Sequence, residues 1–129
     1  MEHVVGIGGI FLKARDPEAL AAWYRDHLGL PVEPGATHGV FAGGASAGGA
    51  PERTVWSLFP ADTAYFGPRA APCMVNYRVA DLDRMLAQLR AAGAAVDDRV
   101  EAHAYGRFGW ATDPEGNRFE LWQPAEPGA

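Results

Sequence analysis

The 129-residue sequence has one cysteine, Cys73, and one lysine, Lys13, which stands beside ten arginines. A single cysteine cannot build a disulfide framework within the chain, so we expect a protein of the reducing cytoplasm. Basic residues are outnumbered by acidic ones, 11 to 16, and the formal net charge is −5. This balance argues against nucleic acid as a partner, because a phosphate backbone selects a basic surface. The bias toward arginine and alanine suggests a GC-rich bacterial genome.

Long apolar runs are also missing, and none approaches the ~20 residues that a transmembrane helix needs. The opening "MEHVVGIGGIFLK" lacks the basic lead and the apolar core of a signal peptide. Hydrophobic residues nevertheless make up 48% of the chain, which is enough to bury a core. We therefore expect one cytoplasmic domain over residues 1–129, with no membrane partner.

An internal repeat divides the sequence into two halves. Residues 4–14 read as a strand, after which Asp16 caps a helix that ends at Gly29. In the second half "CMVNYRVAD" reads as a strand, Asp81 caps the helix "LDRMLAQLRAAG", and Gly93 ends it. The two caps are 65 residues apart and the two glycines are 64 apart, as expected of a repeat with one residue deleted.

The same offset reaches the later strands. Shifted back by 64, "RFELWQP" (118–124) falls on "TVWSLFP" (54–60), and both alternate polar and apolar side chains. "DPEGN" (113–117) predicts a tight hairpin turn before the later strand. The tract "GGASAGGAPE" (43–52) fills the matching hairpin of the first half, where it predicts a long, mobile connection. Each half therefore reads as a strand, a helix and up to three strands in hairpins.

A tandem βαβββ repeat of this size resembles the vicinal oxygen chelate (VOC) superfamily, which includes glyoxalase I, bleomycin-resistance proteins and extradiol dioxygenases. The resemblance covers nearly the whole chain and rests on "FLKARDPEALAAWYRDHLGL", "NYRVADLD" and "DPEGNRFELW". It implies an α+β fold in which module one (about 4–66) and module two (about 72–124) form a cupped, partly open mixed β-barrel with the helices outside. It also implies a homodimer and, in the metal enzymes, a divalent ion at the centre of the cup.

The resemblance places the family's metal ligands at equivalent points on the first and last strands of each module. Counted from the helix caps and by the repeat offset, these positions are Gly9, Trp56, Met74 and Glu120. Glycine and tryptophan offer no ligand, a thioether suits soft metals, and a catalytic zinc normally takes three protein ligands. We therefore expect no metal cofactor, and keep a divalent ion as the alternative.

Glu120 is then a carboxylate at a ligand position without fellow ligands. It is either the partner of a cation, for which strand parity offers Lys13 and Arg78, or a candidate catalytic base or hydrogen-bond acceptor for a bound molecule. His38 and His103 share the repeat offset and could supply a substitute ligand or an acid–base group from the rim. Exposed loop histidines are the commoner case.

Strand alternation assigns the remaining residues of the cup. The predicted ligand-binding side chains are Phe11, Lys13, Trp56, Met74, Asn76, Arg78, Trp110, Glu120 and Trp122. Aromatic walls with a few polar groups are typical of small-molecule sites. The alternative is that Trp56 and Met74 simply plug the barrel, because aromatic stripes often belong to a core.

Three functions remain open, in this order. The first is a metal-independent protein that binds or sequesters a small aromatic or amphipathic molecule, as bleomycin-resistance proteins do. The second is an enzyme, either a glyoxalase-like lyase or isomerase or a dioxygenase, that uses a divalent metal or Glu120 as a base. The third is a dimeric scaffold with a filled barrel and no ligand.

Overall fold

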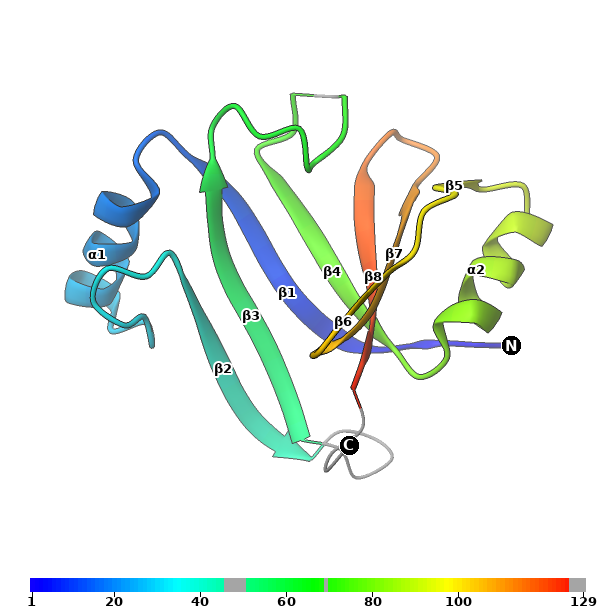
Figure 1. Cartoon of the computed structure of the whole chain (residues 1–129), viewed down its shortest axis with the longest axis horizontal. Helices are drawn as coiled ribbons and strands as arrows, with labels where there is room; N and C mark the ends of the chain where they lie inside the picture. Colours follow the sequence, from blue (N-terminus) through cyan, green and yellow to red (C-terminus); the bar gives the residue numbers. More distant parts are fainter. Residues whose placement is uncertain (46–50, 69, 126–129) are drawn as a thin grey trace.

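In the described part of the chain, two helices lie outside one curved β-sheet (Figure 1). The computed structural model describes residues 1–45, 51–68 and 70–125. The first half contains β1 (Val4–Ala14), α1 (Pro17–Leu28), β2 (His38–Ala45) and β3 (Pro51–Pro60). The second half contains β4 (Cys73–Val79), α2 (Leu82–Ala91), β5 (Ala95–Val96), β6 (Glu101–His103), β7 (Gly106–Thr112) and β8 (Arg118–Pro124).

The sheet is arranged symmetrically about a central antiparallel pair, β1 and β4. β3 lies parallel to β1 on one side, and β8 lies parallel to β4 on the other. Farther out, β2 pairs with β3 and β7 pairs with β8, both antiparallel, while β5 and β6 pair with β7. β2 and β5 end the strand order, so the described strands form a mixed sheet that does not close. The predicted α+β fold of repeated modules in a partly open barrel is confirmed.

Both helices begin at the predicted caps, because each aspartate satisfies a backbone N–H that has no partner within the helix. The Asp16 carboxylate accepts a hydrogen bond from the N–H of Ala19 at 3.1 Å, and Asp81 caps α2 in the same way at 3.0 Å. After the helices the chain turns at glycines with left-handed backbone, Gly29 at φ 67° and Gly93 at φ 82°.

The "DPEGN" turn joins β7 to β8 as predicted. Asp113 Oδ1 accepts hydrogen bonds from the backbone N–H groups of Glu115 and Asn117, both at 2.9 Å, and Gly116 has φ 87°. The matching connection of the first half lies between β2 and β3. Its residues 46–50, on which the predicted mobility falls, lie outside the described residues.

Apolar side chains form two clusters on the outer face of the sheet and one on its inner, concave face. The cluster under α1 contains Ala14, Ala21, Val32, Trp56 and Leu58. The cluster under α2 contains Val79, Leu82, Met85, Leu86 and Leu121. The inner cluster contains Phe11, Phe66, Met74 and Trp110. The two outer clusters pack the helices against the convex face of the sheet, so neither helix covers the concave face.

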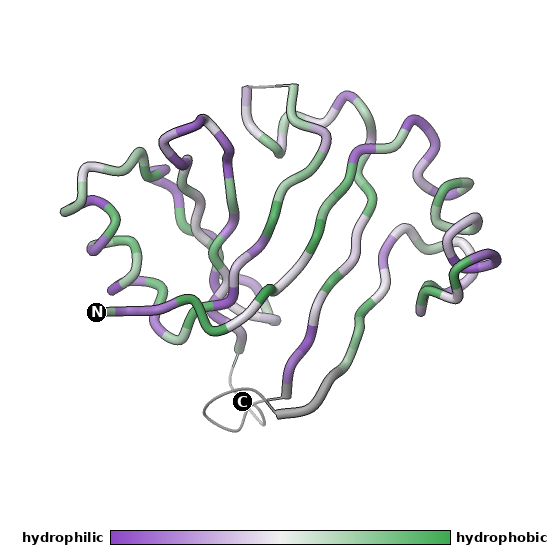
Figure 2. Tube along the Cα trace, turned by 180° about the vertical axis from the view of Figure 1, so that it is seen from behind, coloured by the Kyte–Doolittle hydropathy of each residue, from purple (hydrophilic) through white to green (hydrophobic). Residues whose placement is uncertain are grey.

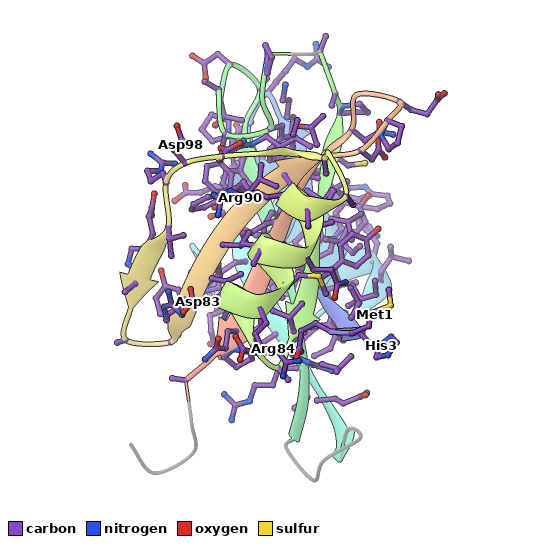
Figure 3. All side chains as sticks on the ribbon, turned by 90° about the vertical axis from the view of Figure 1, so that its right-hand side faces the viewer. Met1, His3, Asp83, Arg84, Arg90 and Asp98 are labelled. Atoms are coloured by element: carbon purple, nitrogen blue, oxygen red, sulfur yellow. The ribbon has the colours of Figure 1, made fainter. Side chains whose placement is uncertain are left out.

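Outside these clusters, both polar and apolar side chains are exposed. Hydrophilic and hydrophobic residues alternate along the helices and strands (Figure 2). The view onto α2 in Figure 3 shows Asp83, Arg84 and Arg90, all exposed, on that helix. None of the helices in the described ranges has the length and apolar character needed to cross a membrane.

Candidate functional site

The concave face of the sheet holds a cavity of about 780 Å³. β1, β3, β4, β7 and β8 supply most of its lining, and β2 and β6 add residues at its rim. Its aromatic walls comprise Phe11, Phe59, Tyr65, Phe108, Trp110 and Trp122. Tyr105 also lines the cavity and is 61% exposed, so the cavity reaches the surface on this side. The barrel is therefore not filled.

Glu120 is a buried carboxylate in this cavity. It is 2% exposed, and β8 places it opposite Asn76 of β4. Asn76 Nδ2 donates a hydrogen bond to Glu120 Oε1 at 2.5 Å, and Trp110 Nε1 donates to Oε2 at 3.0 Å. The hydroxyl of Tyr65 also donates to Oε2. All three donors are neutral, so the carboxylate is held in place without an ion pair to them.

Neither of the two cations expected beside Glu120 forms an ion pair with it in the described part of the chain. Lys13 Nζ lies 5.4 Å from the centroid of the Phe66 ring, next to the inner apolar cluster. Arg78 lies near Glu52 instead. The predicted pairing with Lys13 or Arg78 is wrong, because β4 sets Asn76 opposite Glu120 and carries Arg78 two residues farther along.

Burial raises the pKa of Glu120 above its ordinary value. The hydrogen bonds from Tyr65, Asn76 and Trp110 favour the carboxylate, as does the charge of Arg118, but they do not cancel the effect of burial. Burial, with the charge of Glu120, also raises the pKa of Tyr65, so its hydroxyl keeps its proton and remains a donor. A buried carboxylate with a raised pKa is a stronger base than an exposed one.

Asn76 presents a second polar group next to Glu120. Since its Nδ2 faces the carboxylate, its Oδ1 points away, and this oxygen is buried without a hydrogen-bond partner in the described structure. The side chain fits only because residue 8 is glycine: a Cβ on Gly8 would lie 2.0 Å from Oδ1. The β1–β4 register shifts at this point, between Ile7 and Gly9. Asn76 therefore uses its amide nitrogen for the carboxylate and leaves its buried oxygen unpaired.

A flat aromatic wall is formed by β7 and β8. The rings of Phe108 and Trp122 are parallel within 3°, with centroids 6.0 Å apart. Trp122 Nε1 donates to the backbone oxygen of Tyr105 at 3.0 Å, which holds the indole in place. Tyr105 stacks on His103 at 5.3 Å. His103 and His38 both line the cavity and are exposed, at the ends of β6 and β2.

A guanidinium lies farther along β4. Arg78 follows Asn76 by two residues, so it faces the same side of the sheet, and it is 6% exposed. Its Nη1 donates to the backbone oxygen of Arg53 at 3.3 Å, and its Nη2 lies 3.7 Å from an oxygen of Glu52. Gly6 makes room for it, since a Cβ there would lie 2.3 Å from Nη2. The cavity thus contains a buried carboxylate and a buried guanidinium at different points.

Six of the nine side chains predicted to bind a ligand line the cavity. They are Phe11, Asn76, Arg78, Trp110, Glu120 and Trp122. Met74 is 1% exposed and packs into the inner cluster. Lys13, over the Phe66 ring, and Met74 are not among the lining residues. Met74 therefore fills part of the concave face, as the plugging alternative predicts for that residue.

Trp56 lies on the opposite face of the sheet from the one predicted. It packs against Tyr24 of α1, with ring centroids 4.9 Å apart, in the outer cluster under that helix. The register gives the reason: β1 and β3 pair Trp56 with Ile10, which shares the face of β1 that carries Leu12 and Ala14 into the cluster under α1. The expected facing of Trp56 toward the cup is wrong, and it cannot plug the barrel either.

Ser57, and not Trp56, is the structural equivalent of Glu120. In module two, Asn76 lies five residues before the helix cap and pairs with Glu120. In module one, Phe11 lies five residues before the helix cap and pairs with Ser57. Ser57 lines the cavity. The repeat offset between β3 and β8 is therefore 63, one less than the offset that placed Trp56 there.

Sequence reasoning missed several lining residues, of which Tyr65 contacts the carboxylate directly. Tyr65 lies in the connection between β3 and β4, stacks on Phe59 at 5.3 Å, and has its backbone oxygen held by Arg118 Nε at 3.1 Å. No residue of the second half matches it in the repeat, so the pattern gave no signal. Alternation along β3 and β7 could have found Arg53 and Phe108.

The donor set at the family's metal positions does not fit a three-ligand metal centre. With the corrected register these positions are Gly9, Ser57, Met74 and Glu120. A Cβ on Gly9 would lie 2.9 Å from the ring of Phe11, and both oxygens of Glu120 already accept hydrogen bonds. Across the described ranges, no group of three or more His, Cys, Asp or Glu side chains could hold a metal ion.

Comparison with protein families gives the superfamily of this fold. Residues 9–122 match the model of the glyoxalase-like domain. The chain belongs to this family, within the VOC superfamily. No curated protein matches it.

Solved structures share the fold of this glyoxalase-like domain at low sequence identity. A variant of Streptomyces coelicolor methylmalonyl-CoA epimerase in complex with 2-nitronate-propionyl-CoA aligns with a TM-score of 0.69 and 18% identity, over 96% of this chain and 100% of that one. Methylmalonyl-CoA epimerase from Mycobacterium tuberculosis aligns at 0.61 and 20%, over 95% and 90%. A glyoxalase/bleomycin resistance protein/dioxygenase superfamily member from Vibrio splendidus 12B01 aligns at 0.58 and 14%, over 95% and 99%. At these identities the likeness establishes the fold alone.

Proposed function

We propose that this glyoxalase-like domain binds a small aromatic or amphipathic organic molecule in its cavity. The observation that carries the proposal is the cavity of about 780 Å³, with aromatic walls around the buried carboxylate of Glu120. Small-molecule sites typically have this size and are mostly apolar, with a few polar groups that orient the ligand. A cavity of this kind also argues against a scaffold with a filled barrel.

The polar groups suggest how such a ligand lies. Its ring would stack along the wall of Phe108 and Trp122, and an N–H or O–H group would point to the carboxylate of Glu120. A hydrogen bond to a charged group contributes about 1.5–3 kcal/mol, so a ligand donor that pairs with this carboxylate gains binding free energy.

A binding screen with matched tryptophan variants tests this function. Small aromatic compounds are screened by thermal shift, and those that stabilise the protein are measured by isothermal titration calorimetry. Trp122→Ala should weaken binding by about 1–3 kcal/mol because it removes an aromatic wall. Trp23→Ala is the matched control, since Trp23 is half exposed on α1, away from the cavity. Equal losses in both variants would contradict binding in the cavity.

We propose further that the cavity works without a metal cofactor. The proposal is supported by the donor set, in which one carboxylate, already hydrogen-bonded, stands with a serine, a methionine and a glycine. Elemental analysis of purified protein should find no stoichiometric zinc, nickel, iron or manganese. About one tightly held ion per chain would overturn this part of the proposal.

A second candidate function is catalysis by Glu120 as a general base, and the raised pKa of its carboxyl group favours it. Such a base would remove a proton from a carbon acid bound against the aromatic wall. The test is exchange of a ligand's C–H for deuterium in D₂O, followed by NMR. Exchange that Glu120→Gln abolishes would support catalysis, whereas unchanged ligand in the wild-type protein would leave binding as the function.

We also propose that the protein is a cytoplasmic homodimer. Its single cysteine, Cys73, is free, as a reducing compartment allows. Exposed apolar side chains on β1 and on the edge strand β2 support assembly. They are Val4, Val5, Ile7, Val40 and Phe41. Analytical ultracentrifugation at micromolar concentration should show a dimer, and a monomer would contradict the proposal.

A further inference from the structure

The cavity contains a guanidinium that the hydrogen-bond network of Glu120 does not use. Arg78 is 6% exposed, and both it and Arg53 line the cavity. Burial of a charge is costly unless the charge is paired and its hydrogen-bonding groups are satisfied. The partners of a buried guanidinium are therefore informative about what the cavity receives.

The protein satisfies this guanidinium only in part. A guanidinium has five N–H donors. Among the described residues, Arg78 donates one hydrogen bond, to the backbone oxygen of Arg53 at 3.3 Å. Its ion pair with Glu52 spans 3.7 Å, which is too long for a hydrogen bond, and the Glu52 side chain is 49% exposed. The other donors of Arg78 have no hydrogen-bond acceptor among the described residues, and Arg78 lines the cavity.

The backbone around Arg78 holds its head group in a fixed place. Gly6 of β1 leaves the space that the guanidinium occupies, since a Cβ there would meet Nη2 at 2.3 Å. Arg53 of β3 also lines the cavity, and its backbone oxygen accepts the hydrogen bond from Arg78. A guanidinium matches the oxygens of a carboxylate or a phosphate, because it can donate two parallel hydrogen bonds to them.

The acidic groups of the cavity do not compete for this position. Glu101 lines the cavity, but its oxygens lie 3.1 Å from Arg99 and 3.0 Å from His103. Glu120 accepts hydrogen bonds from its three neutral donors. It lies on β8 opposite Asn76, which precedes Arg78 by two residues on β4. A ligand can therefore place an oxyanion at one point and a donor group at another.

We propose that the ligand of this cavity is an aromatic molecule with an oxyanion, a carboxylate or a phosphate ester, bound by Arg78 and Arg53. This inference rests on the proposed binding function and adds the charge class of the ligand. The aromatic part lies along Phe108 and Trp122, and the oxyanion faces the two arginines.

The test compares probes of one shape and different charge. The probes are 2-naphthoate, the neutral 2-naphthamide and 2-naphthyl phosphate, and their dissociation constants are measured by calorimetry. Wild-type protein should bind at least one anion about tenfold or more tightly than the amide, since hydrogen bonds to a charged group are stronger than those to a neutral one. The stronger of the two anions identifies the oxyanion as carboxylate or phosphate.

Matched arginine variants locate the preference. Arg53→Gln changes an exposed residue and should reduce the ratio between anion and amide several-fold. Arg78→Gln should abolish the preference for the anion over the amide. Circular dichroism checks that this variant is folded. Arg84→Gln is the control: it removes the same charge from the exposed face of α2, outside the cavity, and should keep the ratio.

The outcomes separate this inference from the function on which it rests. Equal binding of the amide and both anions would overturn the oxyanion inference while leaving the cavity as a binding site. An anion preference that Arg53→Gln and Arg84→Gln reduce alike would also overturn it, because the preference would then follow net charge. Failure of all three probes, together with an empty thermal-shift screen, would overturn both.

Discussion

Replacement of Trp56 by alanine should reduce the stability of the protein and leave binding unchanged. Trp56 is 8% exposed and fills the space between β3 and α1, where its ring lies 4.9 Å from that of Tyr24. Loss of a buried tryptophan typically costs about 3–5 kcal/mol, through lost burial and the void that remains. For a chain of this length, this corresponds to a fall of roughly 10–20 °C in melting temperature.

The assay combines urea unfolding with calorimetric titration of the tightest-binding naphthalene probe. Trp56→Phe is the conservative variant, which keeps an aromatic contact with Tyr24 and should recover part of the stability. Trp122→Ala provides the opposite pattern, because Trp122 lines the cavity and its loss should weaken binding. If Trp56→Ala kept its stability and lost binding, the placement of Trp56 under α1 would be refuted.

Three further predictions concern the polar network. Gly8→Ala should destabilise the protein by about 1–3 kcal/mol in urea unfolding, because its Cβ would lie 2.0 Å from Oδ1 of Asn76, and the same change should cost less in an Asn76→Ala background. Tyr65→Phe should raise the pKa of Glu120 further, as seen by carboxyl ¹³C NMR, because it removes a hydrogen bond that favours the carboxylate; an unchanged or lower pKa would contradict this. The pKa of Glu120 is raised in the folded protein, so its stabilising contribution is complete below the ordinary pKa of 4.5 and is lost as pH rises through the folded value. Glu120→Gln should therefore gain stability relative to wild type as pH rises above about 4.5, and a parallel pH dependence of the two proteins would count against the raised pKa.

The elements that local chemistry specifies were predictable from the sequence. Asp16 and Asp81 cap helices, glycines end them, and Asp113 organises the last hairpin through its own side chain. These signals act over a few residues, so a single sequence reveals them. Parity along β4 likewise placed Asn76 and Arg78 on the concave face, because the strand is regular from Cys73 to Val79.

The facing of β3 could not be predicted in the same way. Alternation shows which residues share a face but not which face it is, and only the register against β1 decides this. The offset of 64, taken from the glycine stops, was one residue too large for this strand, and it exchanged Trp56 for Ser57. Tyr65 was not predicted as a site residue for another reason. It reaches Glu120 from a connection that has no counterpart in the repeat, and only the folded chain brings the two together.

The most direct test of ligand binding in the cavity uses the four tryptophans of the chain. Their indole N–H groups give four signals in a ¹⁵N–¹H spectrum, which single Trp→Phe variants assign. Trp110 and Trp122 line the cavity, whereas Trp23 lies exposed on α1 and Trp56 lies beneath it. Titration with the tightest-binding naphthalene probe should shift the signals of Trp110 and Trp122 in saturable fashion and leave those of Trp23 and Trp56 in place. Shifts confined to Trp23 or Trp56, or no saturable shift at Trp110 and Trp122, would contradict a ligand site on the concave face.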